Sequence, residues 1–334
     1  MIRLDRLKVL IPNEYIRAKL EIHYFEKNIR IKGENIPPVV TYILRDQYRN
    51  MGVSYIQVNS DYTVIDLTGK ILKGNYFDMI NINTIEQALE NIGNEAIKIN
   101  NISQAIDTGR VLLLDVTNNL VVNDIEKNIK VMASQRYKQN YELELYKTQA
   151  LVLRNRNKTS NLRTIFYDKQ SELKKQGKGI LEYIDLEDYK DVLRCETNIR
   201  KLKDIRQLLN ISEKDIKLLD VLNSKAKVNY NQLLAMLEEE KEEEDSILLY
   251  GINEITVNTL LKLEGIEGII KKNNYDYKKS MEYIRTRVKK VNKKTLYRTG
   301  LKIKKALEIY KEQAREYYEG KEIMENIKSQ LLTV

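Results

Sequence analysis

Short stretches of alternating apolar and polar residues dominate the first 200 residues, a pattern typical of β-strands with one buried face. The pattern predicts strands over 4–11, 20–31, 53–58, 62–67, 96–99, 110–117, 150–153, 162–167 and 193–199. Residues 110–117 are apolar at nearly every position, so we expect this strand in the middle of a sheet. Helices are expected over 39–48, after Asn83 and over 201–209, and the segment 123–147 begins with helical spacing.

The apolar spacing becomes helical after residue 210 and stays helical to the end of the chain. In the last helix Ile303, Leu307 and Tyr310 follow one another at intervals of four and three, so one side of the helix is apolar. We therefore predict an α+β domain over residues 1–210, built on a largely antiparallel sheet flanked by helices. An all-α region is predicted over residues 211–334.

Composition places the chain among folded proteins and limits its chemistry. Hydrophobic residues make up 42% of the 334 positions and charged residues 31%, which is ordinary for a globular protein. The one cysteine, Cys195, excludes an internal disulfide and favours a reducing cytoplasm. The one histidine, His23, excludes a metal site with two imidazoles from the same chain. No apolar run reaches the roughly 18–20 residues of a membrane span, so we expect no membrane partner.

Basic residues exceed acidic ones, and the excess is concentrated near the end of the chain. The chain has 57 Lys and Arg against 48 Asp and Glu, a formal net charge of +9, which favours a polyanion such as nucleic acid as partner. Residues 271–320 contain 16 Lys and Arg against 6 Asp and Glu. This basic segment is either a solvated helix face or a surface that follows a DNA backbone. Residues 238–245 are acidic and predict a solvated helix face or a linker.

The segment from Arg163 to Glu172 contains a candidate nucleophile. Tyr167 stands at the end of a predicted strand, with Lys169 two positions later and Glu172 five positions later. A tyrosine hydroxyl can form a covalent intermediate when a nearby cation, base or metal activates it. The chain has 22 tyrosines, however, and most of them are expected to be half-buried residues of the core or its rim.

Three acidic residues occupy strand positions where an apolar residue is expected, namely Asp66, Asp115 and Glu196. A buried carboxylate is costly unless it is paired or bound to a metal. One interpretation pairs these acids with Arg163 or Arg194. The other lets them converge on a hard cation such as Mg²⁺ or Mn²⁺, which prefers oxygen ligands. The spacing along the chain leaves both interpretations open.

Four short segments, in this order, resemble the gene II/X family of phage and plasmid replication proteins. They are Val64-Ile-Asp-Leu with the loop Lys70–Phe77, the strand Val111–Thr117, the segment Arg163–Leu173, and the strand Val192–Glu196 with its following helix. The pattern Tyr-x-Lys-x-x-Glu in the third segment is the most specific. The resemblance spans about residues 60–210.

The resemblance implies a rolling-circle replication initiator related to the HUH endonucleases, whose fold is a metal-bearing antiparallel sheet flanked by helices. Such an enzyme nicks and rejoins one DNA strand at an origin through a 5′-phosphotyrosyl intermediate. Tyr167 would be the nucleophile, and Lys169 would stabilise the developing charge. The implied ligands of Mg²⁺ or Mn²⁺ are Asp66, Asp115 and Glu196, supported by Glu172 and Asn75. The implied DNA contacts are Arg163, Arg194, Lys70 and Lys73.

The implied partners are origin DNA, single-stranded or locally melted, and the host helicase and polymerase in the bacterial cytoplasm. The chain departs from the family at Asn75, where the family has histidine, and at Leu113, where it has arginine. The metal site would then be carboxylate-rich or weaker. The alternatives are a catalytically inactive DNA-binding initiator or regulator of the same fold, and a helical interaction protein. A second catalytic tyrosine could come from Tyr137, Tyr141 or Tyr146.

Overall fold

The computed structural model describes residues 1–30, 39–147, 149–157, 162–176, 178–238, 257–273, 276–288 and 292–333. The chain divides into two compact units. The first contains Met1–Glu238 together with Asn326–Val334, and the second contains Glu239–Glu325. The sequence predicted that the first domain ends at residue 210. In the structure the first unit continues for a further 28 residues, to Glu238 (238 − 210), so some of the helices that follow residue 210 belong to it.

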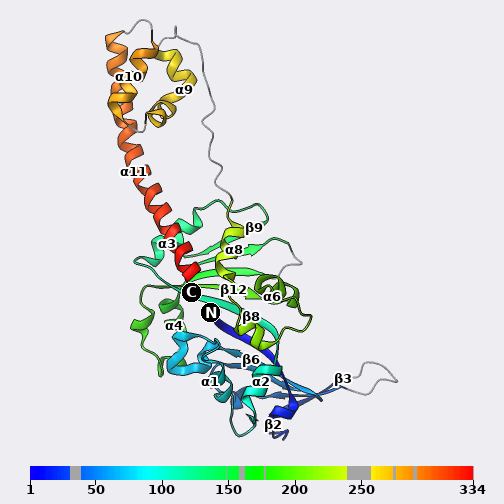
Figure 1. The fold of residues 1–334 in the computed structure, drawn as a ribbon. Helices are drawn as coiled ribbons and strands as arrows, with labels where there is room; N and C mark the ends of the chain where they lie inside the picture. Colours follow the sequence, from blue (N-terminus) through cyan, green and yellow to red (C-terminus); the bar gives the residue numbers. More distant parts are fainter. Residues whose placement is uncertain are drawn as a thin grey trace. The chain divides into compact units, whose positions relative to one another are not determined.

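A ten-stranded antiparallel sheet forms the centre of the first unit (Figure 1). Its strands, in spatial order, are β3 (Phe25–Arg30), β4 (Val39–Leu44), β5 (Val53–Val58), β6 (Tyr62–Thr68), β1 (Leu4–Pro12), β8 (Arg110–Val121), β12 (Val192–Ile199), β11 (Arg163–Asp168), β10 (Ala150–Asn155) and β9 (Tyr141–Tyr146). Strands β2 (Ile16–Ala18) and β7 (Ile97–Ile99) pair separately. The prediction of an α+β fold with a large antiparallel sheet is confirmed, and β8 lies in the interior of the sheet as expected.

Twelve short helices of this unit are described, with η marking 3-10 helices. They are η1 (Asn13–Tyr15), η2 (Asp46–Tyr48), η3 (Gly69–Asp78), α1 (Ile85–Glu90), α2 (Ile102–Thr108), α3 (Ile125–Ala133), α4 (Lys169–Lys175), α5 (Lys178–Leu181), η4 (Leu186–Tyr189), α6 (Leu202–Leu209), α7 (Leu218–Leu222) and α8 (Val228–Met236). Short polar side chains begin several of them. Asn101 caps α2 and Asp124 caps α3, each by accepting a backbone N–H.

One face of the sheet is apolar and carries the main core. Successive side chains of a strand point to opposite faces, so Leu7 and Val9 of β1 share this face with Ile65 of β6 and Leu114 of β8. Helices α1, α2, α6, α7 and α8 contribute buried side chains to the same cluster. The burial of this apolar surface is the main driving force for folding of the unit.

The other face of the sheet is polar and is the one on which the candidate site lies. We call it the polar face. The alternation of the strands assigns to it Tyr55 and Gln57 of β5, Asp66 of β6, Arg6 and Lys8 of β1, Asp115, Thr117 and Asn119 of β8, Arg194, Glu196 and Asn198 of β12, and Arg163 and Tyr167 of β11. A small second layer formed by η3, α4, α5 and η4 has its own buried cluster, which includes Tyr76, Leu173 and Tyr189.

In the described part of the second unit there are three helices, α9 (Val257–Lys272), α10 (Tyr277–Arg287) and most of α11 (Lys293–Thr333). Ile269, Ile284, Ile303 and Leu307 belong to its buried core. Gly265 interrupts α9 with a φ of 68°, a conformation that a glycine adopts readily. From residue 200 onward the described elements are all helices, as predicted for the end of the chain.

The end of α11 belongs to the first unit. The side chain of Gln330 donates to the carbonyl oxygen of Val121 and accepts from its backbone N–H, both at 2.8 Å. Ile327 and Leu331 are buried. The last turns of the chain are therefore anchored at the end of strand β8.

Two predictions of secondary structure are wrong. Residues 39–48, expected to be helical, form strand β4 and then η2, because the β-branched residues Val39 to Thr41 pair with strand β3. The helical pattern of 123–147 holds only for α3, and residues 141–146 form strand β9, which pairs with β10. Most of the acidic run, residues 239–245, lies outside the described residues.

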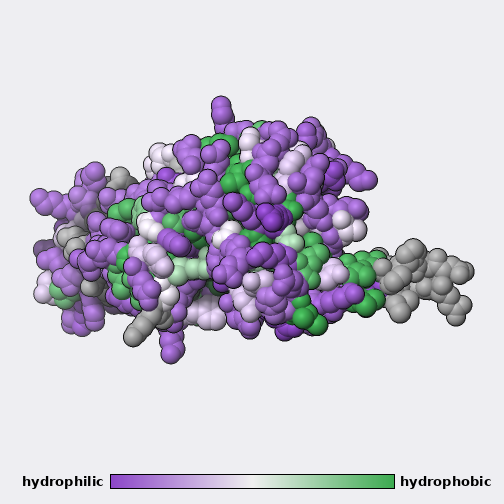
Figure 2. All heavy atoms as spheres, turned by 90° about the horizontal axis from the view of Figure 1, so that it is seen from below, coloured by the Kyte–Doolittle hydropathy of each residue, from purple (hydrophilic) through white to green (hydrophobic). Residues whose placement is uncertain are grey.

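None of the described helices combines the length and the apolar character needed to span a membrane. The face of the molecule seen in Figure 2 is mostly hydrophilic, and its hydrophobic atoms form separate groups. Ile29 of the edge strand β3 and Ile22, which precedes this strand, are among the most exposed large apolar side chains that the structure describes.

Candidate active site

The turn from β11 into α4 positions the two central residues of the predicted nucleophile segment. Tyr167 lies near the end of the strand, and Lys169 is the first residue of the helix. Asp168 between them caps the helix by accepting from the backbone N–H of Ser171 at 2.9 Å and from its hydroxyl at 2.6 Å. Because Glu172 follows one turn after Lys169, its carboxylate reaches the ammonium group at 2.6 Å.

Arg194 of β12 is the centre of the site and is fully buried. Its Nη1 donates to Asp5 Oδ1 at 3.2 Å and to the Tyr76 hydroxyl at 3.1 Å, and its Nε donates to Asn119 Oδ1 at 2.9 Å. Asn119 in turn donates to the backbone carbonyl of Phe77 at 3.4 Å. One guanidinium therefore ties β12 to β1, β8 and η3.

Asp5 reaches this cluster because of an irregularity in strand β1. Leu4 pairs with Val116 and Arg6 pairs with Asp115, so Asp5 is an extra residue in the ladder between β1 and β8. Such a bulge redirects a side chain that regular alternation would place on the other face. Asp5 therefore joins Arg6 on the polar face, although the two residues are adjacent in the sequence.

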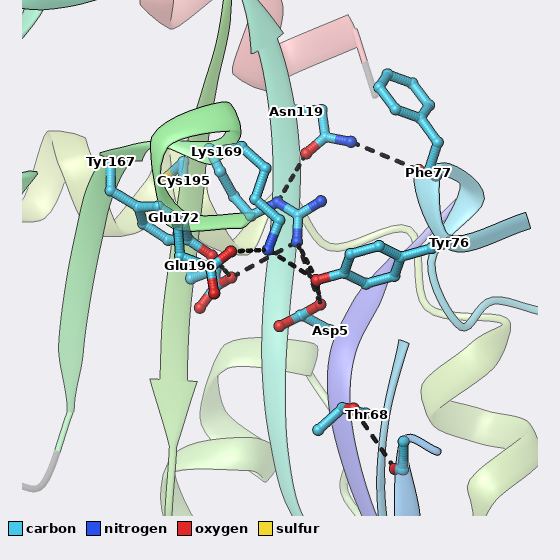
Figure 3. Close-up of polar contacts among 12 residues, drawn as sticks. Asp5, Thr68, Tyr76, Phe77, Asn119, Tyr167, Lys169, Glu172, Cys195 and Glu196 are labelled. Carbon is cyan, nitrogen blue, oxygen red and sulfur yellow. Dashed lines mark hydrogen bonds and ion pairs between the residues drawn. The ribbon is translucent and has the colours of Figure 1, made fainter. Parts of the chain in front are cut away.

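Tyr76 connects the second layer to the sheet. Its hydroxyl donates to Asp5 Oδ1 at 3.1 Å and accepts from Lys169 Nζ at 2.7 Å. The Lys169 side chain is only 1% exposed. Figure 3 shows Tyr76, Lys169, Glu172 and Asp5 directed toward one another from η3, α4 and β1. The cluster brings two buried cations and three carboxylates together, counting Glu196.

The Tyr167 hydroxyl donates a hydrogen bond to Glu196 Oε1 (Figure 3). Glu196 is buried, whereas Tyr167 is half-buried. Arg194 Nη1 lies 4.0 Å from Glu196 Oε1, and Lys169 Nζ lies 5.6 Å from the centroid of the Tyr167 ring. The candidate nucleophile thus has a proton acceptor in contact and two cations close by.

Burial sets the protonation states of this pair. It raises the pKa of Tyr167 well above its ordinary value, and the Glu196 carboxylate adds to the effect. Burial, followed by the charge of Asp5, raises the pKa of Glu196 to about 7. Near neutral pH the tyrosine is therefore protonated, and Glu196 is poised to take up or release a proton.

The two neighbouring charged groups have shifts of their own. Burial, followed by the charge of Arg194, lowers the pKa of Lys169. Burial by itself would raise the pKa of Asp5, but the charges of Arg194 and Lys169, with the hydrogen bond from Tyr76 and the charge of Lys70, together hold that pKa below its ordinary value. Asp5 is thus the firmly ionised carboxylate of the cluster, and Glu196 is the titrating one.

Two of the predicted metal ligands are ion-paired. Asp66 accepts from Nε and Nη2 of Arg6, each at 2.8 Å, and Lys8 Nζ lies 4.0 Å away. Asp115 lies 2.9 Å from Nη1 of Arg200 and accepts from its Nη2 at 3.2 Å. These two acids are ion-paired, as one interpretation predicted, but with Arg6 and Arg200 and not with the arginines named from the sequence. The third acid, Glu196, lies 4.0 Å from Arg194, which was one of the named arginines.

The predicted set of ligands does not form one metal site as it stands. Asp66 and Asp115 lie on β6 and β8, which are separated by β1 and hence by about 10 Å. Glu196, on the next strand, is bonded to Tyr167. Among the described residues no three Asp, Glu, His or Cys side chains are grouped so that they could hold a metal ion. No chemical step is therefore assigned to a metal here.

The remaining predicted site residues lie on the polar face of the sheet or on η3. Arg163 lies on the polar face, where its Nε donates to Asn198. Lys70 is close enough to Asp5 to help lower its pKa. Asn75 and Lys73 are exposed on η3 and have other contacts. Asn75 donates to Gln87 at 3.0 Å, and the Lys73 ammonium lies 5.4 Å from the Tyr183 ring centroid.

Sequence reasoning missed three members of the cluster, Asp5, Tyr76 and Asn119. A sequence signal existed for Asn119, because two adjacent asparagines directly follow the strand predicted over 110–117, the most apolar of the chain. No sequence pattern singled out Tyr76, since it is one tyrosine among 22. Of the other candidate tyrosines, Tyr137 donates its hydroxyl to the carbonyl of Met132 at 2.7 Å, and Tyr141 and Tyr146 lie on the edge strand β9.

Comparisons with known proteins supply no assignment for this arrangement. No model of a protein family matches the chain, and no curated protein matches it.

Proposed function

We propose that this protein is a rolling-circle replication initiator, an HUH-like enzyme that nicks and rejoins one DNA strand with Tyr167 as its nucleophile. The observation that carries the proposal is the hydrogen bond from the Tyr167 hydroxyl to Glu196, a buried carboxylate with a pKa of about 7. The resemblance of the surrounding segments to the gene II/X family supports the same assignment.

In the proposed reaction the Tyr167 oxygen attacks the phosphorus at the nick site, and its proton passes to Glu196. The bond between phosphorus and the 3′ oxygen breaks. The leaving 3′ oxygen takes a proton from water and becomes a free 3′-hydroxyl. The other strand end remains on Tyr167 as a 5′-phosphotyrosyl ester. Rejoining is the reverse, in which a 3′-hydroxyl attacks the ester and Tyr167 recovers its proton.

Arg194 and Lys169 lie close to the Tyr167–Glu196 pair and are suited to stabilise, through space and without contacting the phosphate, the negative charge that develops on the phosphate oxygens. Both cations are held in place by several contacts in a water-poor environment, where preorganised charges act most strongly. Arg163, Arg200 and Arg6 lie along the polar face beside the site and are at least partly accessible, so they can follow the backbone of a bound strand. A divalent metal, expected from the resemblance, would neutralise phosphate charge when bound.

A second candidate is a DNA-binding initiator or regulator that does not cut. The ion pairs favour it, because Arg6 and Arg200 neutralise the two acids that a metal would need. The polar face would then bind a strand and leave its backbone intact. The two candidates share DNA as partner and differ in whether a covalent adduct forms.

Covalent capture decides between them. The protein is incubated with the supercoiled replicon from which its gene derives, and with single strands covering that replicon, with Mn²⁺ or with EDTA. Wild type is compared with Tyr167→Phe and with Tyr55→Phe, a control on the same face of the sheet. We expect a detergent-resistant adduct in wild type and in the control but none in Tyr167→Phe.

Two results would contradict the proposal. An adduct that survives in Tyr167→Phe would place the nucleophile on another residue. Tight, salt-sensitive binding without any adduct, with Mn²⁺ or without it, would support the second candidate.

A further inference from the structure

We propose that the second unit binds double-stranded DNA through the outward side of α11, with Tyr297, Arg298 and Leu301 entering a groove of the duplex. This activity goes beyond the proposed nicking and does not depend on it. It also assigns a different form of DNA to each unit, a single strand to the polar face and a duplex to α11.

The packing of α11 determines which of its side chains face outward. Ile303 and Leu307 are buried in the core of the second unit. A Cβ atom at Gly300 would lie 2.9 Å from the Tyr277 hydroxyl, so α11 and α10 approach each other closely there. With 3.6 residues per turn, the opposite side of α11 presents Lys294, Tyr297, Arg298, Leu301 and Lys305, all of them exposed.

Two of these outward residues are large and apolar. Tyr297 is 68% exposed and Leu301 is 50% exposed, one turn apart on the same side of the helix. No other large hydrophobic residue of the second unit is as exposed among the side chains that the structure describes. The pair therefore forms a small apolar patch that the core of the unit does not use.

The surroundings of the patch are strongly basic. Residues 276–288 and 292–305 contain ten Lys and Arg against two Asp and Glu. Lys294, Arg298, Lys302 and Lys305 are exposed on α11 around Tyr297 and Leu301. This charge is complementary to a phosphate backbone, whose bound counterions would be released on binding.

A DNA duplex fits this surface better than a lipid bilayer does. Helices that bind at membrane surfaces bury a long apolar face, whereas the first turns of α11 expose two apolar side chains and turn Leu296, Ile303 and Leu307 to the core. The major groove of DNA, about 12 Å wide, admits one helix.

The order of the helices fits groove binding as well. In helix-turn-helix proteins the first turns of the second helix contact base edges, while the first helix crosses the backbone. Here α10 precedes α11, and the exposed stripe occupies the first turns of α11. Arg298 can contact guanine, Leu301 and Tyr297 can contact thymine methyl groups, and Lys294 and Lys305 can contact phosphates.

The test uses the full chain and three probes, a random duplex of about 30 base pairs, a single strand of the same length, and anionic phosphatidylglycerol vesicles. The triple variant Lys294→Ala/Arg298→Ala/Lys305→Ala is expected to lose duplex affinity by on the order of 10- to 100-fold near 0.15 M salt, and the slope of log affinity against log salt should fall by about 2 to 3. The control Lys203→Ala/Lys214→Ala/Lys225→Ala removes the same charge from exposed positions of the first unit.

The double variant Tyr297→Ala/Leu301→Ala separates groove contact from charge attraction. Wild type is expected to select a preferred sequence from a random duplex pool. The double variant should lose this preference while the salt slope stays unchanged, because no charge is removed. Circular dichroism melting checks that each variant is folded, as expected for substitutions at exposed positions.

Three results would overturn the proposal. In the first, the triple variant and its control lose duplex affinity equally. In the second, vesicle binding is lost in place of duplex binding. In the third, the single strand is affected as strongly as the duplex. Adduct formation on a single-stranded substrate should remain at the wild-type level in all α11 variants, so failure of this proposal and failure of the nicking proposal are distinguishable.

Discussion

The polar face of the sheet contains two kinds of arginine–carboxylate contact, and they differ in access to water. Arg194, which contacts Asp5, is fully buried. In the pair Arg6–Asp66 the carboxylate is buried but the arginine side chain is 34% exposed, and in Arg200–Asp115 the arginine is 24% exposed. In the exposed pairs the guanidinium can exchange its carboxylate for water or phosphate. In the buried cluster the guanidinium of Arg194 cannot make this exchange.

This difference in access to water suggests that the two kinds of contact on the polar face have different roles. The buried cluster holds Tyr167, Glu196 and Lys169 in a fixed arrangement, which is what a reactive group requires. In the proposed function, the exposed pairs would hold these arginines in position for a DNA strand. A buried charge that loses its partner is costly, whereas an exposed one loses little.

The largest effect is expected for Arg194→Met. It leaves Asp5 and Asn119 without their buried partner, and the loss of unfolding free energy should be about 3–5 kcal/mol. Urea denaturation followed by circular dichroism measures this loss. Tyr189→Phe, a change in the adjoining second layer that removes no charge, is the control. A loss as small as that of Arg6→Met would contradict the distinction drawn between the two kinds of pair.

An intermediate effect is expected for Glu196→Gln, and it depends on pH. The pKa of Glu196 is raised from 4.5 to about 7 in the folded protein. The folded state therefore holds an additional proton on Glu196 between these two pH values, so the contribution of Glu196 to stability is greatest below pH 4.5 and declines as the pH rises to about 7, by up to roughly 3 kcal/mol. Glu196→Gln should flatten this decline, whereas Glu142→Gln on the edge strand should not.

The titration of Glu196 should also appear in the pH dependence of the proposed nicking reaction. The rate of adduct formation is expected to rise with pH around a midpoint of about 7, because Glu196 must be ionised to accept the proton of Tyr167. In Glu196→Gln the rate should be low at every pH. A wild-type rate that is constant from pH 5.5 to 8.5 would show that another group takes the proton.

The smallest effect on stability is expected for Arg6→Met. Lys8 Nζ already lies 4.0 Å from Asp66 and can replace the lost cation, so the loss of unfolding free energy should be about 1 kcal/mol or less. Binding of a single strand should nevertheless weaken, with a lower salt slope, because one phosphate contact is lost. Fluorescence anisotropy measures this binding. Unchanged affinity would remove Arg6 from the binding surface.

The local pattern of the chain predicted most of the sheet but not all of it. Alternation correctly located β5, β6, β11 and β12, and the nearly continuous apolar run of 110–117 correctly located β8. The pattern did not predict strands β4 and β9. Residues 39–48 carry β-branched residues that only the pairing with β3 and β5 holds extended, and β9 lies at the edge of the sheet, where few apolar residues are required.

By itself the sequence indicated that Tyr167 ends a strand and that Lys169 and Glu172 follow it closely. The structure adds that these two residues lie in the first turn of a helix that Asp168 caps. The sequence also determined that acidic residues would interrupt buried strands. Only the tertiary structure decided which arginine pairs with which acid, since partners 60 and 85 positions apart are set by strand order and register. The bulge that brings Asp5 to Arg194 depends on the neighbouring strand, and no local pattern records it.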